Sequence, residues 1–371
     1  MIDDRDRVFL ARALELGARG LRTVAPNPPV GCVIARHGTT VAEGWHVRPG
    51  GPHAEAMALD IAQEGARDAT AYLTLEPCAH HGRTPPCADA LIAAGIERAV
   101  ILAGDPAPYA AGAGPLRLAD AGIRVDLVDE DDPLAVAARR LAAGFRTTMV
   151  LGRPHVTYKA AQTLDGRTAT RDGDSRWISG PGSRAHVHEL RARAGAVLVG
   201  AGTAQADDPL LTARDCDPPA ERQPLRVVWD RGARLDPNGR LAASTGEGPV
   251  LVLCSPEADA AARQALEGRG VETLAVDGLH AGLEALGERD VQTVLCEGGA
   301  RLAGALVGAG LIDRLIAVVA PRILGDPEAP GLLGRTGLPA ATMDDAMDLA
   351  GWSWSTIGDD LWIEAWLRDP P

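Results

Sequence analysis

Lysine is nearly absent from this chain of 371 residues, since Lys159 is the single lysine among 37 basic residues. Genome composition most simply explains such an arginine bias, so the bias itself indicates no function. Long apolar runs are also missing, and the stretch LIAAGIERAVILAG is broken by Glu97 and Arg98, whereas a membrane-spanning helix needs about 20 apolar residues. The first residues are acidic where a secretory signal is basic. We therefore expect no membrane partner and a cytoplasmic location.

Positive charge is in deficit as well, because the formal net charge is -13. A general nucleic-acid surface needs clustered Lys and Arg, so no nucleic-acid partner is expected. A small phosphorylated substrate needs only a local basic pocket and stays possible.

The six cysteines show no regular spacing and stand at positions 32, 78, 87, 216, 254 and 296. In a cytoplasmic protein this pattern favours metal binding or burial over a disulfide framework, and we expect Cys254 and Cys296, which end apolar runs, to be buried.

The length of the chain predicts two domains. A helix is expected over residues 4–19, followed by alternating strands and helices that predict a mixed or parallel sheet sandwiched by helices. A helix over residues 133–149 closes the first half. The pattern changes near Arg153-Pro154, because a residue before proline favours extended backbone, and strands and helices then alternate again. We predict one domain at residues 1–150 and a second at residues 151–371.

A metal motif lies in the first half. His53 opens a predicted helix, Cys78 follows a predicted strand, and Cys87 begins the next helix. One imidazole and two thiolates are three ligands for tetrahedral zinc and leave a fourth position for water. Glu55 lies two residues past the histidine, where it can move a proton between that water and a leaving amine. The order H-x-E followed by P-C and C is the signature of zinc deaminases.

The stretch between the two cysteines offers competing ligands. His80 and His81 follow Cys78 closely, and either could reach a metal. Cys87 is favoured because a helix N-terminus stabilises a thiolate. His80, His81 and Arg83 would then lie on a loop over the site, free to contact substrate.

The second half lacks the G-x-G-x-x-G fingerprint of a Rossmann domain. Glu297-Gly298-Gly299 instead ends a predicted strand and precedes a helix, where glycines and free N–H groups can approach a phosphate. Arg191 and Arg214 are natural partners for a substrate phosphate through bidentate pairing. Each of these signals is weak on its own, because a surface arginine and a glycine turn are common.

The first half resembles the deaminase domain of the RibD family, the bifunctional enzymes of riboflavin biosynthesis. The segments that carry the resemblance include EGWHVRPGGPHAE and TLEPCAHHGRTPPCADALIAAG. It implies an α/β fold with a three-layer, cytidine-deaminase-like first domain, zinc on His53, Cys78 and Cys87, and Glu55 as proton shuttle. The implied substrate is 2,5-diamino-6-(5-phosphoribosylamino)pyrimidin-4(3H)-one, with Asn27 as a pyrimidine contact. The family usually reads DPNP where Ala107 stands here, so no contact is assigned at that position.

The second half resembles the reductase domain of the same family, through KAAQTLDGRTAT, VGAGTAQADDPLLTAR and CEGGARLAGAL. The resemblance implies a dihydrofolate-reductase-like fold that uses NADPH to reduce the ribosyl side chain to ribityl. The implied substrate contacts are Ser175, Arg191, Leu211, Arg214 and Glu297. The implied NADPH contacts are Ala161, Trp177, Thr203, Asp207, Gly299, Ala300, Arg301, Leu302, Ala303, Gly304 and Ala305. Lys159 and Asp165 are placed near the site, and Arg231, where the family often has serine, either binds the 2′-phosphate of NADPH or points outward.

Two other functions stay open at this point. One is a deaminase for another nucleobase or a tRNA, with a second domain that binds but does not reduce. The other is a nucleotide-sensing module with a structural zinc, which would leave Glu55 without a purpose. The family resemblance also implies a homo-oligomer, a dimer or a tetramer, through the reductase domain.

Overall fold

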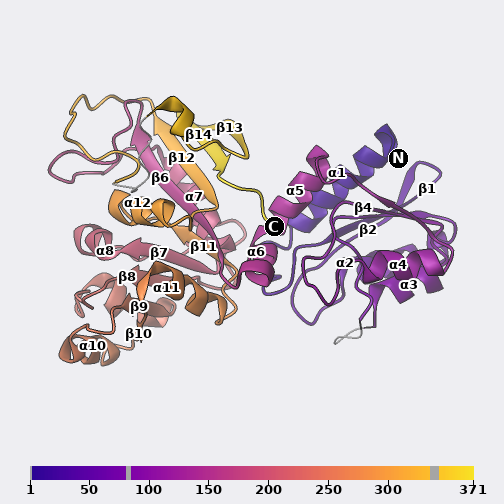
Figure 1. Cartoon of the computed structure of the whole chain (residues 1–371), viewed down its shortest axis with the longest axis horizontal. Coiled ribbons are helices and arrows are strands. Elements are labelled where there is room, and N and C mark those ends of the chain that lie inside the picture. Colours follow the sequence, from indigo (N-terminus) through magenta and orange to yellow (C-terminus); the bar gives the residue numbers. More distant parts are fainter. Residues whose placement is uncertain (1, 81–84, 335–341) are drawn as a thin grey trace. The chain divides into compact units, whose positions relative to one another are not determined.

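The computed structural model describes residues 2–80, 85–334 and 342–371, so that the predicted loop residues His81 and Arg83 lie outside the described residues. The chain forms two compact units (Figure 1). The first comprises Met1–Gly152 together with Asp369–Pro371, and the second comprises Arg153–Arg368. No helix within the described ranges is long and apolar enough to cross a membrane.

Helices and strands alternate along the first unit. Its helices are α1 (Asp4–Ala18), α2 (Ala54–Ala62), α3 (Cys87–Ala93), α4 (Ala113–Asp120), α5 (Pro133–Leu141) and α6 (Ala143–Leu151). Its strands are β1 (Gly31–Arg36), β2 (Thr39–Trp45), β3 (Thr70–Leu73), β4 (Arg98–Ile101) and β5 (Arg124–Leu127). The helix predicted over residues 133–149 is wrong in one respect: it is divided into α5 and α6, because Ala142 leaves helical geometry (φ -91°, ψ 18°).

The five strands form a mixed sheet in the order β2-β1-β3-β4-β5. Strand β1 is antiparallel to both neighbours, and β3, β4 and β5 are parallel. Successive side chains of a strand point to opposite faces. Accordingly Cys32 and Ile34 pack with α2, α3 and α4, whereas Val33 and Ala35 pack with α1 and α5 (Figure 1). The mixed sheet between two helical layers confirms the predicted three-layer α/β class.

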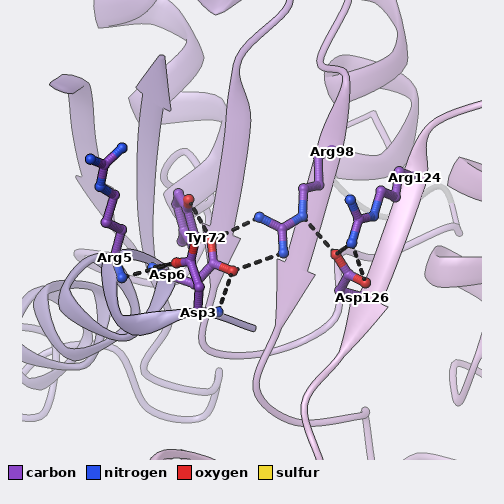
Figure 2. Close-up of polar contacts among 7 residues, drawn as sticks. All are labelled: Asp3, Arg5, Asp6, Tyr72, Arg98, Arg124 and Asp126. Carbon is purple, nitrogen blue, oxygen red and sulfur yellow. Dashed lines mark hydrogen bonds and ion pairs between the residues drawn. The ribbon is translucent and has the colours of Figure 1, made fainter. Parts of the chain in front are cut away.

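A polar network fixes the start of α1 on this sheet (Figure 2). The guanidinium of Arg98 donates two hydrogen bonds of 2.8 Å to Asp6 and a third of 2.6 Å to Asp126. The hydroxyl of Tyr72 donates to Asp6 at 2.9 Å. Burial raises the pKa of Asp6, but the hydrogen bonds from Arg98, Asp3 and Tyr72 outweigh it and leave that pKa lowered. The network therefore stabilises α1 against the face of the sheet opposite to α2 and α3.

The second unit is built on a larger sheet. Its strands are β6 (His155–Thr163), β7 (Ala196–Gly200), β8 (Leu225–Trp229), β9 (Val250–Cys254), β10 (Glu272–Ala275), β11 (Thr293–Cys296), β12 (Arg314–Ala320), β13 (Gly351–Ile357) and β14 (Asp360–Trp366). Its helices are α7 (Pro181–Arg193), α8 (Ala201–Asp207), α9 (Arg240–Ala243), α10 (Ala260–Glu267), α11 (Gly278–Gly287) and α12 (Ala300–Gly308).

These nine strands follow the order β10-β9-β8-β7-β11-β6-β12-β14-β13. All pairs are parallel except those that β14 makes with β12 and β13. Helices α11 and α12 pack on one face, and α9 and α10 pack on the other. Cys254 and Cys296 are buried in these cores, as expected. Cys296 pairs in register with Tyr158 of β6 and Leu198 of β7, so the residues after them, Lys159 and Glu297 among them, meet at the carboxyl edge of the sheet.

Candidate active sites

Three elements converge on the predicted metal site. His53 is the N-cap of α2, Cys87 is the first residue of α3, and Cys78 follows the loop after β3. Close backbone packing holds two of these elements. A Cβ on Gly44 of β2 would lie 2.2 Å from the Ala54 carbonyl oxygen at the start of α2. A Cβ on Gly114 of α4 would lie 1.9 Å from the Pro77 carbonyl oxygen, one residue before Cys78.

The three side chains form one ligand cluster. The ligand atoms of His53, Cys78 and Cys87 all lie within 4.8 Å of one another. Nδ1 of His53 is 3.2 Å from the sulfur of Cys87 and 3.7 Å from that of Cys78. Tetrahedral zinc with ordinary bond lengths would separate a nitrogen and a sulfur ligand by about 3.6 Å. The arrangement therefore fits zinc with little adjustment, and the other side chains within the described ranges form no comparable cluster.

The sulfurs of Cys78 and Cys87 shift each other's pKa in opposite directions. Hydrogen bonds from Cys87 and His53 hold the pKa of Cys78 well below its usual range, and the backbone N–H of Cys87 also donates to its sulfur at 3.3 Å. The neighbouring Cys78 sulfur in turn raises the pKa of Cys87. Two thiolates so close together repel each other, so a divalent cation between them removes the cost of ionising both.

Glu55 lies beside this cluster without belonging to it. Its side chain is 3% exposed and lies close enough to Cys87 to influence the pKa of that thiol. Burial raises the pKa of its carboxyl group, which eases proton uptake near neutral pH. Cys32, which lies near Glu55 in the sheet, is fully buried, and burial raises the pKa of its thiol. Cys32 is therefore a core residue and no ligand.

Asn27 reaches the cluster through a histidine that the sequence analysis did not assign. Its amide nitrogen lies 2.9 Å from Nε2 of His46, whose Nδ1 lies 2.9 Å from the Pro52 carbonyl oxygen. The His46 ring meets the His53 ring edge-on, with centroids 5.1 Å apart. Burial lowers the pKa of His46. The only sequence signal for His46 was its place in EGWHVRPGGPHAE, a segment that carried the family resemblance.

The loop after Cys78 is described only in part. His80 is exposed, and its ring meets the Tyr109 ring edge-on with centroids 5.8 Å apart. Asp105, two residues before Ala107, interacts electrostatically with His80 and Cys78. Burial raises its pKa, and its carboxylate accepts a hydrogen bond of 2.8 Å from the Ala107 N–H. Ala107 itself is 1% exposed, so this position offers no side chain to a ligand.

A cavity of about 1110 Å³ lies in the second unit, where the carboxyl ends of β6, β7 and β11 meet. Open parallel sheets bind their ligands at this edge. The cavity is lined by fourteen of the residues predicted from the sequence: Lys159, Ala161, Ser175, Trp177, Arg191, Thr203, Asp207, Arg214, Glu297, Gly299, Ala300, Arg301, Leu302 and Ala305. The second unit therefore gathers most of its predicted contacts around one space.

Four of the predicted residues do not line this cavity. Leu211 is 2% exposed and packs in the core beside α8. Ala303 and Gly304 face the buried side of α12. Asp165 accepts hydrogen bonds from Thr163 and from the backbone of residues 324 and 325, so it fixes a turn. Arg231 is exposed and does not line the cavity either.

A half-buried cluster of charged side chains, formed by Lys159, Arg191 and Glu297, lines the cavity. Arg191 of α7 pairs with Glu297 through two hydrogen bonds of 2.6 and 3.0 Å. Burial raises the pKa of Glu297, but Arg191 and then Lys159 outweigh it and leave that pKa lowered. Burial lowers the pKa of Lys159. Within the described ranges the Lys159 amine makes no hydrogen bond or ion pair, so it is available to a ligand in the cavity.

One face of α7 adds two residues that sequence reasoning missed. Arg184, His188 and Arg191 recur at the spacing of helix neighbours and all line the cavity. Nδ1 of His188 lies 3.2 Å from the Thr212 carbonyl oxygen. This contact fixes the loop that carries Arg214. Arg191 is already neutralised by Glu297. The remaining positive charge on this wall comes from Arg184 and from Arg214, whose guanidinium lies 3.9 Å from the carboxylate of Asp215.

The start of α12 forms the opposite wall. Gly299 is its N-cap, and the Gly299 N–H donates to the Thr203 hydroxyl at 2.9 Å. A Cβ on Gly298 would lie 3.1 Å from the Gly200 nitrogen and 2.9 Å from a Leu302 methyl group. Glycine at position 298 therefore allows the close approach of α12 to β7, and the first residues of the helix, Ala300 and Arg301, line the cavity.

Fold and sites together define a class of protein, a zinc-type deaminase domain joined to a reductase domain of the dihydrofolate-reductase-like kind. Two family models match the chain. The cytidine and deoxycytidylate deaminase zinc-binding region matches residues 3–103, and the RibD C-terminal domain matches residues 154–363.

The chain belongs to the RibD family of bifunctional deaminases and reductases of riboflavin biosynthesis. It is 42% identical to the riboflavin biosynthesis protein RibD of Escherichia coli over 90% of this chain and 92% of that one, and 41% identical to the Haemophilus influenzae RibD over 96% of each. The solved structure of Acinetobacter baumannii RibD is similar with a TM-score of 0.83 and 37% identity, covering 98% of both chains. A Thermotoga maritima structure, described as a diaminohydroxyphosphoribosylaminopyrimidine deaminase and 5-amino-6-(5-phosphoribosylamino)uracil reductase, gives a TM-score of 0.81 at 35% identity over 98% of each chain.

These findings confirm the predicted family, fold class and bifunctional enzyme class, with zinc and NADPH as cofactors. The alternative of a deaminase with a non-catalytic second domain is not favoured, because the second domain matches the reductase model over nearly its whole length.

Proposed function

We propose that residues 1–150 remove the 2-amino group of 2,5-diamino-6-(5-phosphoribosylamino)pyrimidin-4(3H)-one by hydrolysis. We further propose that residues 151–371 then reduce the ribosyl side chain to give 5-amino-6-(5-phosphoribitylamino)uracil. The observation that carries the first step is the convergence of His53, Cys78 and Cys87 beside the buried carboxyl group of Glu55. The division between the two activities is supported by the two compact units and by the ranges of the two family models.

In the deaminase unit we assign His53, Cys78 and Cys87 as zinc ligands. When bound, zinc supplies a Lewis acid that acidifies a water molecule in the position that three protein ligands leave open. Glu55 accepts a proton from the attacking water and returns it to the departing amine, so that water and the amino group become a carbonyl oxygen and ammonia. Its raised pKa suits both halves of this transfer.

Substrate recognition in this unit is assigned to Asn27, His80 and Arg83. Asn27 is supported by its link to the metal site through His46. His80 is exposed on the loop that leaves Cys78. Arg83 lies outside the described residues, and its assignment rests on the charge that a phosphorylated substrate needs.

In the reductase unit the large cavity is assigned to NADPH and the deaminated pyrimidine together. NADPH supplies a hydride when bound. The size of NADPH suits a cavity of about 1110 Å³, and its phosphates suit the start of helix α12, which lines one wall. We assign it to the wall formed by Ala161, Trp177, Thr203, Asp207 and the start of α12 from Gly299. Ala303, Gly304 and Leu211, which stand back from the cavity, would act through their neighbours.

The remaining wall is assigned to the substrate. Arg214 faces the ribose phosphate, while Ser175 and Glu297 face the sugar and the base. Lys159 is half-buried and interacts electrostatically with Glu297. Its pKa is lowered, so it can exchange a proton with the sugar oxygen as the ring opens. Asp165 supports the turn after β6.

We also propose that the enzyme is a cytoplasmic homo-oligomer. The six cysteines are free in the structure, and both zinc ligation and free thiols are favoured in a reducing compartment. The oligomer follows from the family resemblance.

Mass analysis of the products tests this function. Incubation with the diaminopyrimidine compound alone should give a product about one mass unit heavier, because an NH group is replaced by oxygen, and should release ammonia. Addition of NADPH should give a further gain of about two mass units. An unchanged substrate mass in the zinc-loaded enzyme, or a reduced product that keeps both amino groups, would rule out the proposed order.

A further inference from the structure

His46 connects two parts of the deaminase site that are distant in sequence. It follows β2 directly and is 3% exposed. One ring nitrogen, Nδ1, lies 2.9 Å from the carbonyl oxygen of Pro52, the residue before the zinc ligand His53. The other, Nε2, lies 2.9 Å from the side-chain nitrogen of Asn27. One imidazole thus contacts both the start of α2 and the turn that carries Asn27.

The chemistry of these partners fixes the proton on His46. A carbonyl oxygen can only accept a hydrogen bond, so Nδ1 carries the hydrogen and donates it to Pro52. In a neutral imidazole Nε2 is then an acceptor, and its partner on Asn27 must be the amide NH₂ group. The carboxamide of Asn27 is therefore held in one of its two orientations. Its oxygen makes no hydrogen bond with any described residue, so it is left for a ligand.

We propose that His46 is a positioning residue of the deaminase, which orients Asn27 so that its amide oxygen accepts a hydrogen bond from an N–H donor of the substrate. The proposal rests on the proposed deamination of an aminopyrimidine, whose amino groups and ring N–H are such donors. A flipped Asn27 would present NH₂ to those donors and oppose them. The bond to Pro52 ties this recognition to the helix start that carries His53 and Glu55.

A double-mutant cycle separates this role from simple packing against His53. His46→Leu keeps an apolar side chain of similar size and removes both hydrogen bonds. His46→Gln supplies an amide oxygen that can accept from Asn27. Asn27→Ala removes the group that His46 orients. The kcat/KM for ammonia release is measured for each variant and for His46→Leu/Asn27→Ala, together with zinc content. The NADPH-dependent reduction of the deaminated compound serves as an internal control, since it uses the other unit.

We expect His46→Leu to lower kcat/KM by about 10- to 100-fold, because a misplaced contact costs up to about 100-fold, with full zinc content and unchanged reduction. His46→Gln should recover to within about 5-fold of the wild type. Because His46 acts through Asn27, the double variant should be no worse than Asn27→Ala alone. Additive losses, a Gln variant as poor as the Leu variant, or zinc loss in His46→Leu would each overturn the proposal.

Nitrogen-15 NMR of histidine-labelled, zinc-loaded protein gives a readout that does not depend on turnover. It should find His46 protonated at Nδ1 and bare at Nε2. The opposite tautomer would overturn the proposal even if deamination is normal. Conversely, a wild-type enzyme with this tautomer that releases no ammonia from the diaminopyrimidine compound would refute the proposed substrate, so the two failures are distinguishable.

Discussion

The close approach of α4 to the zinc loop makes Gly114 a sensitive position. The substitution Gly114→Ala would place a Cβ 1.9 Å from the Pro77 carbonyl oxygen and 3.0 Å from its carbonyl carbon. To widen the first contact even to 3.0 Å, the backbone must move by about 1.1 Å. Both contact atoms are backbone and no rotamer change relieves them. A zinc ligand tolerates displacements of only about 0.2 Å, and Cys78 is the next residue. We therefore expect zinc affinity to fall by about 10- to 100-fold, as for other changes just outside a metal site, and the unit to lose about 1–3 kcal/mol from overpacking.

Competition for zinc against a chromophoric chelator measures this effect. Gly246→Ala is the matched control, because no atom lies within 4 Å of its added Cβ. Reduction of the deaminated compound should be normal in both variants and reports that the second unit is intact. A Gly114→Ala variant with wild-type zinc affinity and stability would refute the close packing of α4 on Pro77 and, with it, the reasoning that this contact places Cys78.

Further predictions concern the two sites and the fold. Cys87→Ser should lose zinc in the same chelator assay, whereas His80→Ala should retain it and change only KM; the reverse pattern would exchange their roles. Lys159→Met should lower kcat/KM of the reduction by about 100-fold or more through the loss of a proton-transferring group, with ammonia release unchanged, and wild-type reduction rates would exclude that role. Burial lowers the pKa of His155 to about 4, and its Nε2 is buried without a partner in the described chain. The unfolded imidazole takes up a proton below pH of about 6.5, so stability is lost as pH falls from there toward 4, by about 2 kcal/mol at pH 5. Urea unfolding at pH 7 and pH 5 should show this loss of unfolding free energy in the wild type and not in His155→Leu. The same loss in both proteins would contradict the prediction.

Much of the fold follows from local patterns. The alternation of predicted strands and helices in the first half indicates a sheet sandwiched by helices, and the structure places helices on both faces of the strand that contains Cys32 and Val33. The single helix predicted over residues 133–149 was wrong, because nothing in its apolar pattern marks Ala142 as the break. The order of the nine strands was not predictable, since pairing between distant strands leaves no local signature.

The site residues also fall into those that the sequence could predict and those that only the fold brings together. His53, Cys78 and Cys87 could be named because metal chemistry restricts residue types and because they stand at the ends of predicted elements. Glu297 and Lys159 become neighbours only through the register of β11 on β6, which spacing does not reveal. Ala303 and Gly304 were predicted as part of a continuous range, whereas helix periodicity turns one side of α12, which includes both residues, into the core. His46 was missed because its role depends on two hydrogen-bond partners that only the fold brings together.

The central claim is that two separate sites act in sequence on one substrate. The most direct test is NADPH oxidation by wild-type and Glu55→Gln enzyme, each loaded with zinc, with either the diaminopyrimidine compound or its deaminated product. The wild type should oxidise NADPH with both compounds, with ammonia release preceding oxidation for the first. Glu55→Gln should bind zinc and oxidise NADPH at the wild-type rate with the deaminated product. With the diaminopyrimidine compound it should oxidise no NADPH. NADPH oxidation by Glu55→Gln with the diaminopyrimidine compound would contradict the account.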